Sequence, residues 1–350
     1  MSVDPRFFRI VSGIRVVDLA AHLRATVSVG DTDQVITGVA PLAIAGPGDV
    51  TFQSAGPTTD SELAAGVIII TTADIAAQIA EITQLESERT ILIVDYPRRS
   101  FASALDMIVE AAEPRGCKTY VDHSAQIHPT ASVGHGVMIG VGSVVEAGAV
   151  IKSGVVIGAN CNIGANSVLS HCNIASHVTI GAGTVIGDSG FGFEMTKDGV
   201  IHLPHVGIVR IATGCVIGNQ CSIDRGSLGD TVLGRSVMID NMCHIAHNVQ
   251  IGDRSIVAAQ CGISGSVDIG VDVQIGGQVG IAPHLKIGDG AVLTARTGVT
   301  KDVGRNTQMA GFPAIEASRY WRERAALRRL SKSPSKARKK DKKELKRNEK

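Results

Sequence analysis

The stretch LGRSVMIDNMCHIAHNVQIGDRSIVAAQCGISGSVDIG, residues 233–270, carries an aliphatic side chain at every sixth position. A period of six fits neither an α-helix, with 3.6 residues per turn, nor a simple amphipathic strand, with a period of two. Hexapeptide repeats predict a parallel β-helix, in which three repeats form one triangular coil and the aliphatic side chains stack inside. The run continues unbroken to residue 299, and an earlier run covers residues 127–186 with a single slip after residue 169.

The composition agrees with this architecture. The 350 residues include 40 glycines, while aromatic residues make up only 3%. Glycine permits tight corners, and a narrow coil interior is filled by Val, Ile, Leu and Ala. With a strand spacing of about 4.8 Å, residues 123–304 predict roughly nine or ten coils, a prism about 45 Å long.

Other segments lack the period. Residues 1–112 alternate apolar runs, at 67–70 and 91–94, with helix-like stretches at 72–82 and 98–112, which predicts a small α/β domain. We expect a linker at 113–122, a helical segment at 305–330 and a disordered basic tail at 331–350. The tail holds ten Lys or Arg against three Asp or Glu, a net charge of +7, so the rest of the chain sums to −6. An insertion at 187–207 interrupts the coils, and such loops commonly build a binding face.

Several classes of protein are disfavoured. No apolar run approaches the ~18 residues of a membrane span, and the N-terminus lacks the apolar core of a secretory signal. The 7 cysteines include no CxxC pair, which favours buried free thiols in a cytoplasmic protein over disulfides or a metal site. A basic tail on a mildly acidic body is no sign of nucleic-acid binding.

The candidate chemistry centres on two histidines. His247 follows the inward-facing Ile245 by two positions, so we expect it outside the coil, where an imidazole can act as a general base. A lone surface histidine is more often simply solvated, which is our interpretation of His244. His284 lies 37 residues beyond His247, two coils and one residue, and should project from the same edge about 10 Å away. Gly265 lies one coil above His247 and either presents a backbone N–H to an oxyanion or is one more corner glycine.

Around these residues the sequence resembles the UDP-3-O-(3-hydroxyacyl)glucosamine N-acyltransferases of lipid A biosynthesis. The matching stretches are PLAIAGPGD (41–49), GFGF (190–193), IDRGSLGDT (223–231), IDNMCHIAHNVQIGD (239–253), GGQVGIAPHLKIGDG (276–290) and YWRERAALRRL (320–330). The resemblance implies a uridine-binding α/β domain, a left-handed parallel β-helix and C-terminal helices. It also implies a homotrimer with active sites between subunits.

The resemblance further implies a role for individual residues. His247 would be the general base as the glucosamine 2-amino group attacks the thioester of a 3-hydroxyacyl-acyl carrier protein, and the Gly265 N–H would hold the oxyanion. No metal or cofactor is implied, because the acyl group arrives on the phosphopantetheine arm of the carrier protein. Residues implied in substrate binding are His284, Asp240, Asn241, Phe52, Phe191 and Phe193, and carrier docking is assigned to Arg322, Arg324 and Arg328.

The sequence also departs from the family. Ala55 and Thr58 stand where the family usually has Asn and Tyr, and Pro283 replaces a small residue. Three alternatives therefore remain: an acyltransferase for another nucleotide-linked amino sugar, an O-acyltransferase or acetyl-CoA-dependent sugar acetyltransferase, and a non-catalytic scaffold. The domain before the repeats argues against an O-acyltransferase, whose repeats begin near the N-terminus. The histidines argue against the scaffold.

Overall fold

The computed structural model describes residues 3–54, 64–82, 89–112, 118–197, 199–312 and 314–332. Ala55 and Thr58, most of the basic tail and part of the predicted linker lie outside these residues. The chain divides into two compact units, 1–310 and 311–350. In the second, the described helix is α4 (Ala317–Lys332).

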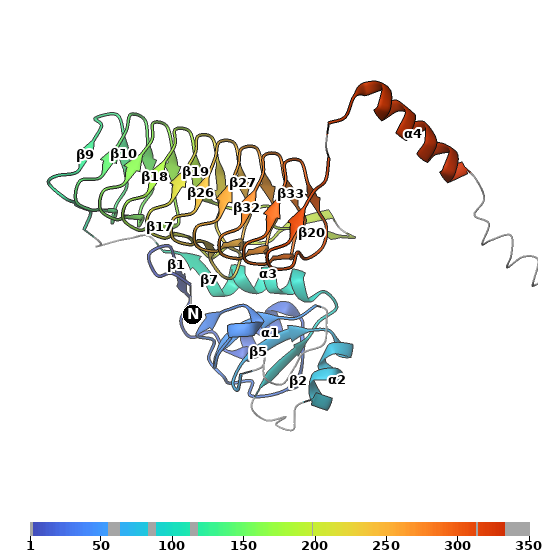
Figure 1. The fold of residues 1–350 in the computed structure, drawn as a ribbon. Coiled ribbons are helices and arrows are strands. Elements are labelled where there is room, and N and C mark those ends of the chain that lie inside the picture. The colour runs from blue at the N-terminus through green and yellow to red at the C-terminus, as the bar shows by residue number, and fades with distance from the viewer. Residues whose placement is uncertain are drawn as a thin grey trace, which may run out of the picture. The chain divides into compact units, whose positions relative to one another are not determined.

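A parallel β-helix with three faces dominates the first unit (Figure 1). The three sheets contain nine, nine and ten strands, in agreement with the predicted number of coils. The first face contains β8 (Tyr120–Val121), β11 (Met138–Ile139), β14 (Val156–Ile157), β17 (Cys172–Ile174), β22 (Val209–Ile211), β25 (Thr231–Leu233), β28 (Gln250–Ile251), β31 (Asp268–Ile269) and β34 (Lys286–Ile287). The second contains β9 (Gln126–Ile127), β12 (Val144–Val145), β15 (Asn162–Ile163), β18 (Thr179–Ile180), β23 (Val216–Ile217), β26 (Met238–Ile239), β29 (Ile256–Val257), β32 (Gln274–Ile275), β35 (Val292–Leu293) and β37 (Gln308–Met309). The third contains β10 (Ser132–Val133), β13 (Val150–Ile151), β16 (Val168–Leu169), β19 (Val185–Asp188), β24 (Ser222–Asp224), β27 (His244–Ile245), β30 (Gly262–Ile263), β33 (Gly280–Ile281) and β36 (Gly298–Val299).

The aliphatic position of each repeat forms the core. In the third face Ile245 pairs with Ile263, which pairs with Ile281 one coil further on, and all three are at most 2% exposed. The final rung, β37, lies beyond residue 304, where the sequence period placed the end of the β-helix.

Corner residues stack as regularly as the core. Asn248, Ser266 and His284 occupy one corner of successive coils with φ of 62°, 58° and 60°. The Ser266 N–H donates to the His247 carbonyl at 3.0 Å, and the His284 N–H donates to the Gly265 carbonyl at 3.1 Å. Residues 18 positions apart are therefore vertical neighbours, as the coil length predicts.

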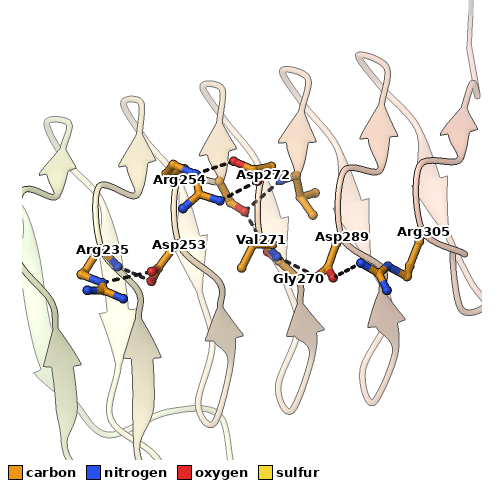
Figure 2. Close-up of polar contacts among 10 residues, drawn as sticks. Arg235, Asp253, Arg254, Gly270, Val271, Asp272, Asp289 and Arg305 are labelled. Carbon is orange, nitrogen blue, oxygen red and sulfur yellow. Dashed lines mark hydrogen bonds and ion pairs between the residues drawn. The ribbon is translucent and has the colours of Figure 1, made fainter.

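A ladder of Asp and Arg side chains follows the corner between the first and second faces (Figure 2). Its ion pairs are Arg235–Asp253 at 3.1 Å, Arg254–Asp272 at 2.6 Å and Arg305–Asp289 at 3.0 Å. Exposed pairs of this kind add little stability. The carboxylates also accept backbone N–H groups: Asp253 from Arg235 at 2.7 Å and Asp289 from Val271 at 3.0 Å. The ladder therefore orders the corner backbone.

Thiols line part of the coil interior. Cys221, Cys243 and Cys261 each immediately precede a strand of the third face in successive coils, and each is 2% exposed. Their Sγ atoms donate to backbone carbonyls one coil above at 3.2, 3.2 and 3.1 Å. Every cysteine within the described ranges is free and buried, which confirms their interpretation as small core side chains.

The N-terminal α/β domain has a five-stranded sheet of order β2-β6-β5-β4-β3. The pairs β6–β5, β5–β4 and β4–β3 are parallel, and β2 is antiparallel to β6. The sheet strands are β2 (Thr26–Val29), β3 (Gly38–Val39), β4 (Asp49–Phe52), β5 (Ile68–Thr71) and β6 (Thr90–Ile93), and the helices are α1 (Val16–Leu23), the 3₁₀ helix η1 (Leu42–Ile44), α2 (Ala73–Ile82) and α3 (Pro97–Ile108). The predicted small α/β domain is confirmed. Helix α3 ends four residues before the predicted boundary at 112, because β7 (Val109–Ala111) pairs with β1 (Phe8–Ile10).

The insertion connects this domain to the coils. It contains the antiparallel pair β20 (Phe193–Thr196) and β21 (Gly199–His202). Val206 and Ile208, which follow the pair, are buried in the same core cluster as Phe101 and Leu105 of α3. The insertion therefore fixes α3 against the coils that carry His247.

Candidate active site

A groove of about 820 Å³ brings together residues from three distant parts of the chain. Phe52 comes from the end of β4, Phe191 from the insertion, and His247 from the corner after β27. Gly265 and His284 follow one and two coils further on. The described lining residues are Phe52, Ser54, Arg98, Phe191, Ser227, His244, Ala246, His247, Gly262, Ile263, Ser264, Gly265, Ser266, Pro283 and His284.

The His247 ring is oriented by its neighbour in sequence. Its Nδ1 lies 3.0 Å from Asn248 Oδ1. That oxygen also accepts the Ser227 backbone N–H at 2.9 Å, while Asn248 Nδ2 donates to the Gly229 carbonyl at 3.3 Å. A backbone N–H can only donate, so the amide has this orientation and Nδ1 of neutral His247 must carry the proton. Nε2 is then the unprotonated nitrogen, as a general base requires.

Gly265 packs directly against the imidazole. A Cβ added to Gly265 would lie 2.6 Å from both Cε1 and Nε2 of His247, far closer than a van der Waals contact. Corner geometry alone does not require this glycine, because the equivalent position one coil further on is Pro283. The space that it leaves is occupied by the His247 ring.

Two buried polar residues beside His247 were not predicted from the sequence. His205 is 3% exposed, its ring centroid is 5.0 Å from that of His247, and its Nδ1 lies 2.9 Å from Ser189 Oγ. Burial, with a smaller effect of His247, lowers the pKa of His205 to about 3, so it is neutral near pH 7. Asp224 is 6% exposed, and burial raises the pKa of its carboxyl even though His244 Nε2 lies 3.7 Å away.

These two residues explain the glycines of the SGFGF segment. A Cβ on Gly190 would lie 3.0 Å from His247 Cβ and 3.1 Å from Asp224 Oδ2, and one on Gly192 would lie 2.7 Å from the His205 ring. The insertion backbone thus closes over the histidines at contact distance. The motif was visible in the sequence, but its packing against His205 was not.

Other predicted site residues lie apart from the groove. Asp240 and Asn241 occupy the corner between the second and third faces, whereas His247 lies between the third and first. Asn241 donates to Asp240 Oδ1 at 2.7 Å and accepts the Asn219 N–H at 2.8 Å. Phe193 does not line the groove, and its ring contacts Phe191 at 4.8 Å.

The three predicted docking arginines, Arg322, Arg324 and Arg328, lie on α4 in the second unit. Arg324 is placed over the ring of Tyr320 at 5.2 Å. Conversely, Arg98 and His244 line the groove, although the sequence indicates no such role for Arg98 and predicts a solvated side chain for His244.

Within the described ranges, no three or more His, Cys, Asp or Glu side chains are arranged to bind a metal ion. Nor does any helix in that part of the chain have the length and apolar character to cross a membrane.

The fold and comparisons with known proteins define a class. Residues 230–265 match the family model described as bacterial transferase hexapeptide (six repeats), and the protein is a hexapeptide-repeat acyltransferase with a left-handed parallel β-helix. Proteins named UDP-3-O-acylglucosamine N-acyltransferase are similar over nearly the whole chain. The one from Maricaulis maris is 43% identical, covering 96% of this chain and 99% of its own. Those from Granulibacter bethesdensis and a Caulobacter species are 45% and 37% identical, covering 94% and 93% of this chain and 97% and 96% of theirs. The chain belongs to the UDP-3-O-acylglucosamine N-acyltransferase family.

Proposed function

We propose that this protein transfers a 3-hydroxyacyl chain from acyl carrier protein to the 2-amino group of UDP-3-O-(3-hydroxyacyl)glucosamine, in lipid A biosynthesis. The observation that carries the proposal is the groove itself. It joins a ring suited to stacking on uracil, Phe52, to a base with a free Nε2, His247, and to a second imidazole, His284.

The chemistry needs one base and one oxyanion donor. The amine attacks the thioester carbonyl carbon while His247 Nε2 accepts a proton from the nitrogen. The negative charge that develops on the carbonyl oxygen is stabilised by the Gly265 N–H. When the C–S bond breaks, the imidazolium returns its proton to the departing thiolate, which leaves an amide and the free thiol of the carrier. The remaining acceleration comes from holding the two substrates together.

The third face offers space for an acyl chain. The outward position of three successive strands is glycine: Gly262, Gly280 and Gly298, and an added Cβ on each would meet nothing within 4 Å. Glycine within a strand often marks a site where a ligand approaches the backbone closely. A chain starting at Gly262 beside His247 would follow this glycine column toward the C-terminal end of the coils.

A homotrimer accounts for the position of Asp240 and Asn241. In one subunit they lie at a different corner from His247, and a site between subunits would combine the two corners. Mixed trimers test this directly. We expect His247→Ala and Asp240→Ala chains to be inactive on their own and to regain part of the activity when refolded together, because some sites then combine one intact corner from each chain.

Carrier docking is proposed for α4. Trp321, Leu327 and Leu330 are 67%, 56% and 70% exposed, and Arg322, Arg324 and Arg328 add positive charge to the same helix. Acyl carrier proteins are acidic, so the interaction should weaken with salt. A Michaelis constant for the carrier that is independent of salt would contradict this role. We also propose that the enzyme acts in the cytoplasm, where its carrier is found.

The decisive experiment incubates the protein with a 3-hydroxyacyl-acyl carrier protein and the acylated UDP-glucosamine, and follows products by mass spectrometry. An amide-linked diacyl product that disappears with His247→Ala supports the proposal. Transfer only to a different nucleotide-linked amino sugar would favour the alternative acceptor. Absence of turnover with every acceptor would favour a scaffold.

A further inference from the structure

One cation in the groove has no role in the mechanism above. Arg98 occupies the first turn of α3 and lines the groove with His247 and His284. It also lines a smaller apolar pocket that opens beside Phe52 and Phe101. Arg98 is the only Lys or Arg among the described residues that line the groove, and these residues include no Asp or Glu. Within the described part of the chain, Arg98 is therefore the one permanent positive charge that lines the groove.

Arg98 is held there by a weak contact. Its Nε lies 3.7 Å from Glu194 Oε2 on β20, beyond hydrogen-bonding distance, and that oxygen is buried with no hydrogen-bond partner among the described residues. The Arg98 side chain is 48% exposed. An anion with better geometry could replace Glu194 as the partner of Arg98, because the 3.7 Å contact is too long for a hydrogen bond and the guanidinium is half exposed.

We infer that Arg98 binds the diphosphate of the nucleotide-linked acceptor and exchanges its ion pair with Glu194 for the phosphate oxygens. This inference rests on the proposed function and adds a specificity residue to the same site. A guanidinium presents a planar fork of N–H donors that matches phosphate oxygens. The start of α3 adds to the positive potential, since its N-cap residue, Tyr96, makes no side-chain capping bond.

Position along the groove supports the diphosphate over other parts of the ligand. A nucleotide sugar places its phosphates between base and sugar. Arg98 contributes to the same walls as Phe52, which is proposed to stack on the base, and His247, which would act on the sugar.

The test measures binding of UDP and of uridine to the full chain by calorimetry. Arg98→Ala should weaken UDP binding about 10- to 100-fold, the loss expected for a charge-assisted hydrogen bond, and leave uridine binding unchanged. Arg98→Lys should recover part of the loss. Arg99→Ala is the matched control, because it removes the same charge from the next residue of α3, which does not line the groove. Glu194→Gln should leave UDP binding unchanged or tighten it.

Three results would overturn the inference. Arg98→Ala could weaken uridine binding as much as UDP binding, which would mean a damaged base pocket. Arg99→Ala could weaken UDP binding as much as Arg98→Ala does, or the wild-type protein could bind no UDP. The acyl transfer assay run in parallel separates the two proposals. Arg98-dependent UDP binding without acyl transfer refutes only the proposed reaction, whereas acyl transfer with Arg98-independent UDP binding refutes only the role of Arg98.

Discussion

Replacing Gly265 with alanine tests whether packing against His247 positions the base. The new Cβ would lie 2.6 Å from Nε2 and Cε1 of the ring, whereas ordinary contacts begin at 3.4 Å. The imidazole must therefore move by about 0.8 Å, and a misplacement on the order of 1 Å can cost about 10²-fold in rate. We expect kcat to fall about 100-fold with little change in KM. The melting temperature should hardly change, because a side chain, and not backbone, gives way.

The assay is steady-state transfer with both substrates varied, together with thermal unfolding. Gly277→Ala is a suitable control, because its added Cβ would make an ordinary 3.4 Å contact with the Ala259 carbonyl. The alanine variant keeps the backbone N–H at position 265, so an oxyanion role alone predicts no loss. Wild-type kcat in Gly265→Ala would show that the glycine does not position His247.

Four further changes have expected outcomes. His247→Ala should reduce kcat by about 10²- to 10⁴-fold without lowering the melting temperature, and near-normal turnover would exclude it as the base. Asn248→Gly, which suits the φ of 62°, should lower kcat about three- to tenfold by releasing the His247 ring, as steady-state rates would show. Gly298→Leu should block the glycine column and shorten the longest acyl chain accepted, measured with a carrier series of increasing chain length. The pKa of His205 is about 3 when folded and about 6.5 when unfolded. Below pH 6.5 the unfolded state therefore binds more protons than the folded state, and the free energy of unfolding decreases as the pH is lowered. His205→Gln should remove about 2 kcal/mol of the stability lost between pH 7 and pH 5, as measured by urea unfolding.

The hexapeptide period predicted the β-helix because one buried aliphatic residue per face is a local, repeated requirement. It also predicted that His247, Gly265 and His284 share an edge, since vertical neighbours follow from a coil of 18 residues. No such rule applies to the insertion. His205 and Asp224 approach His247 because the 187–207 segment folds back over the coils, and nothing periodic records that path. Arg98 comes from another domain, and its position depends on how α3 packs against the insertion.

The stacked thiols have a practical consequence. Cys221, Cys243 and Cys261 point into the coil interior just before the strands β24, β27 and β30 of the third face, and each is 2% exposed. A thiol reagent can reach them only while the surrounding coils are transiently open, so the rate of thiol modification reports how often the coils open locally. Cys172, whose pKa burial raises to about 12, belongs to an earlier coil and provides an internal reference. Comparing the modification rate of Cys172 with that of Cys221, Cys243 and Cys261, with and without substrate, would measure how strongly a bound nucleotide sugar suppresses the opening of the coils beneath it.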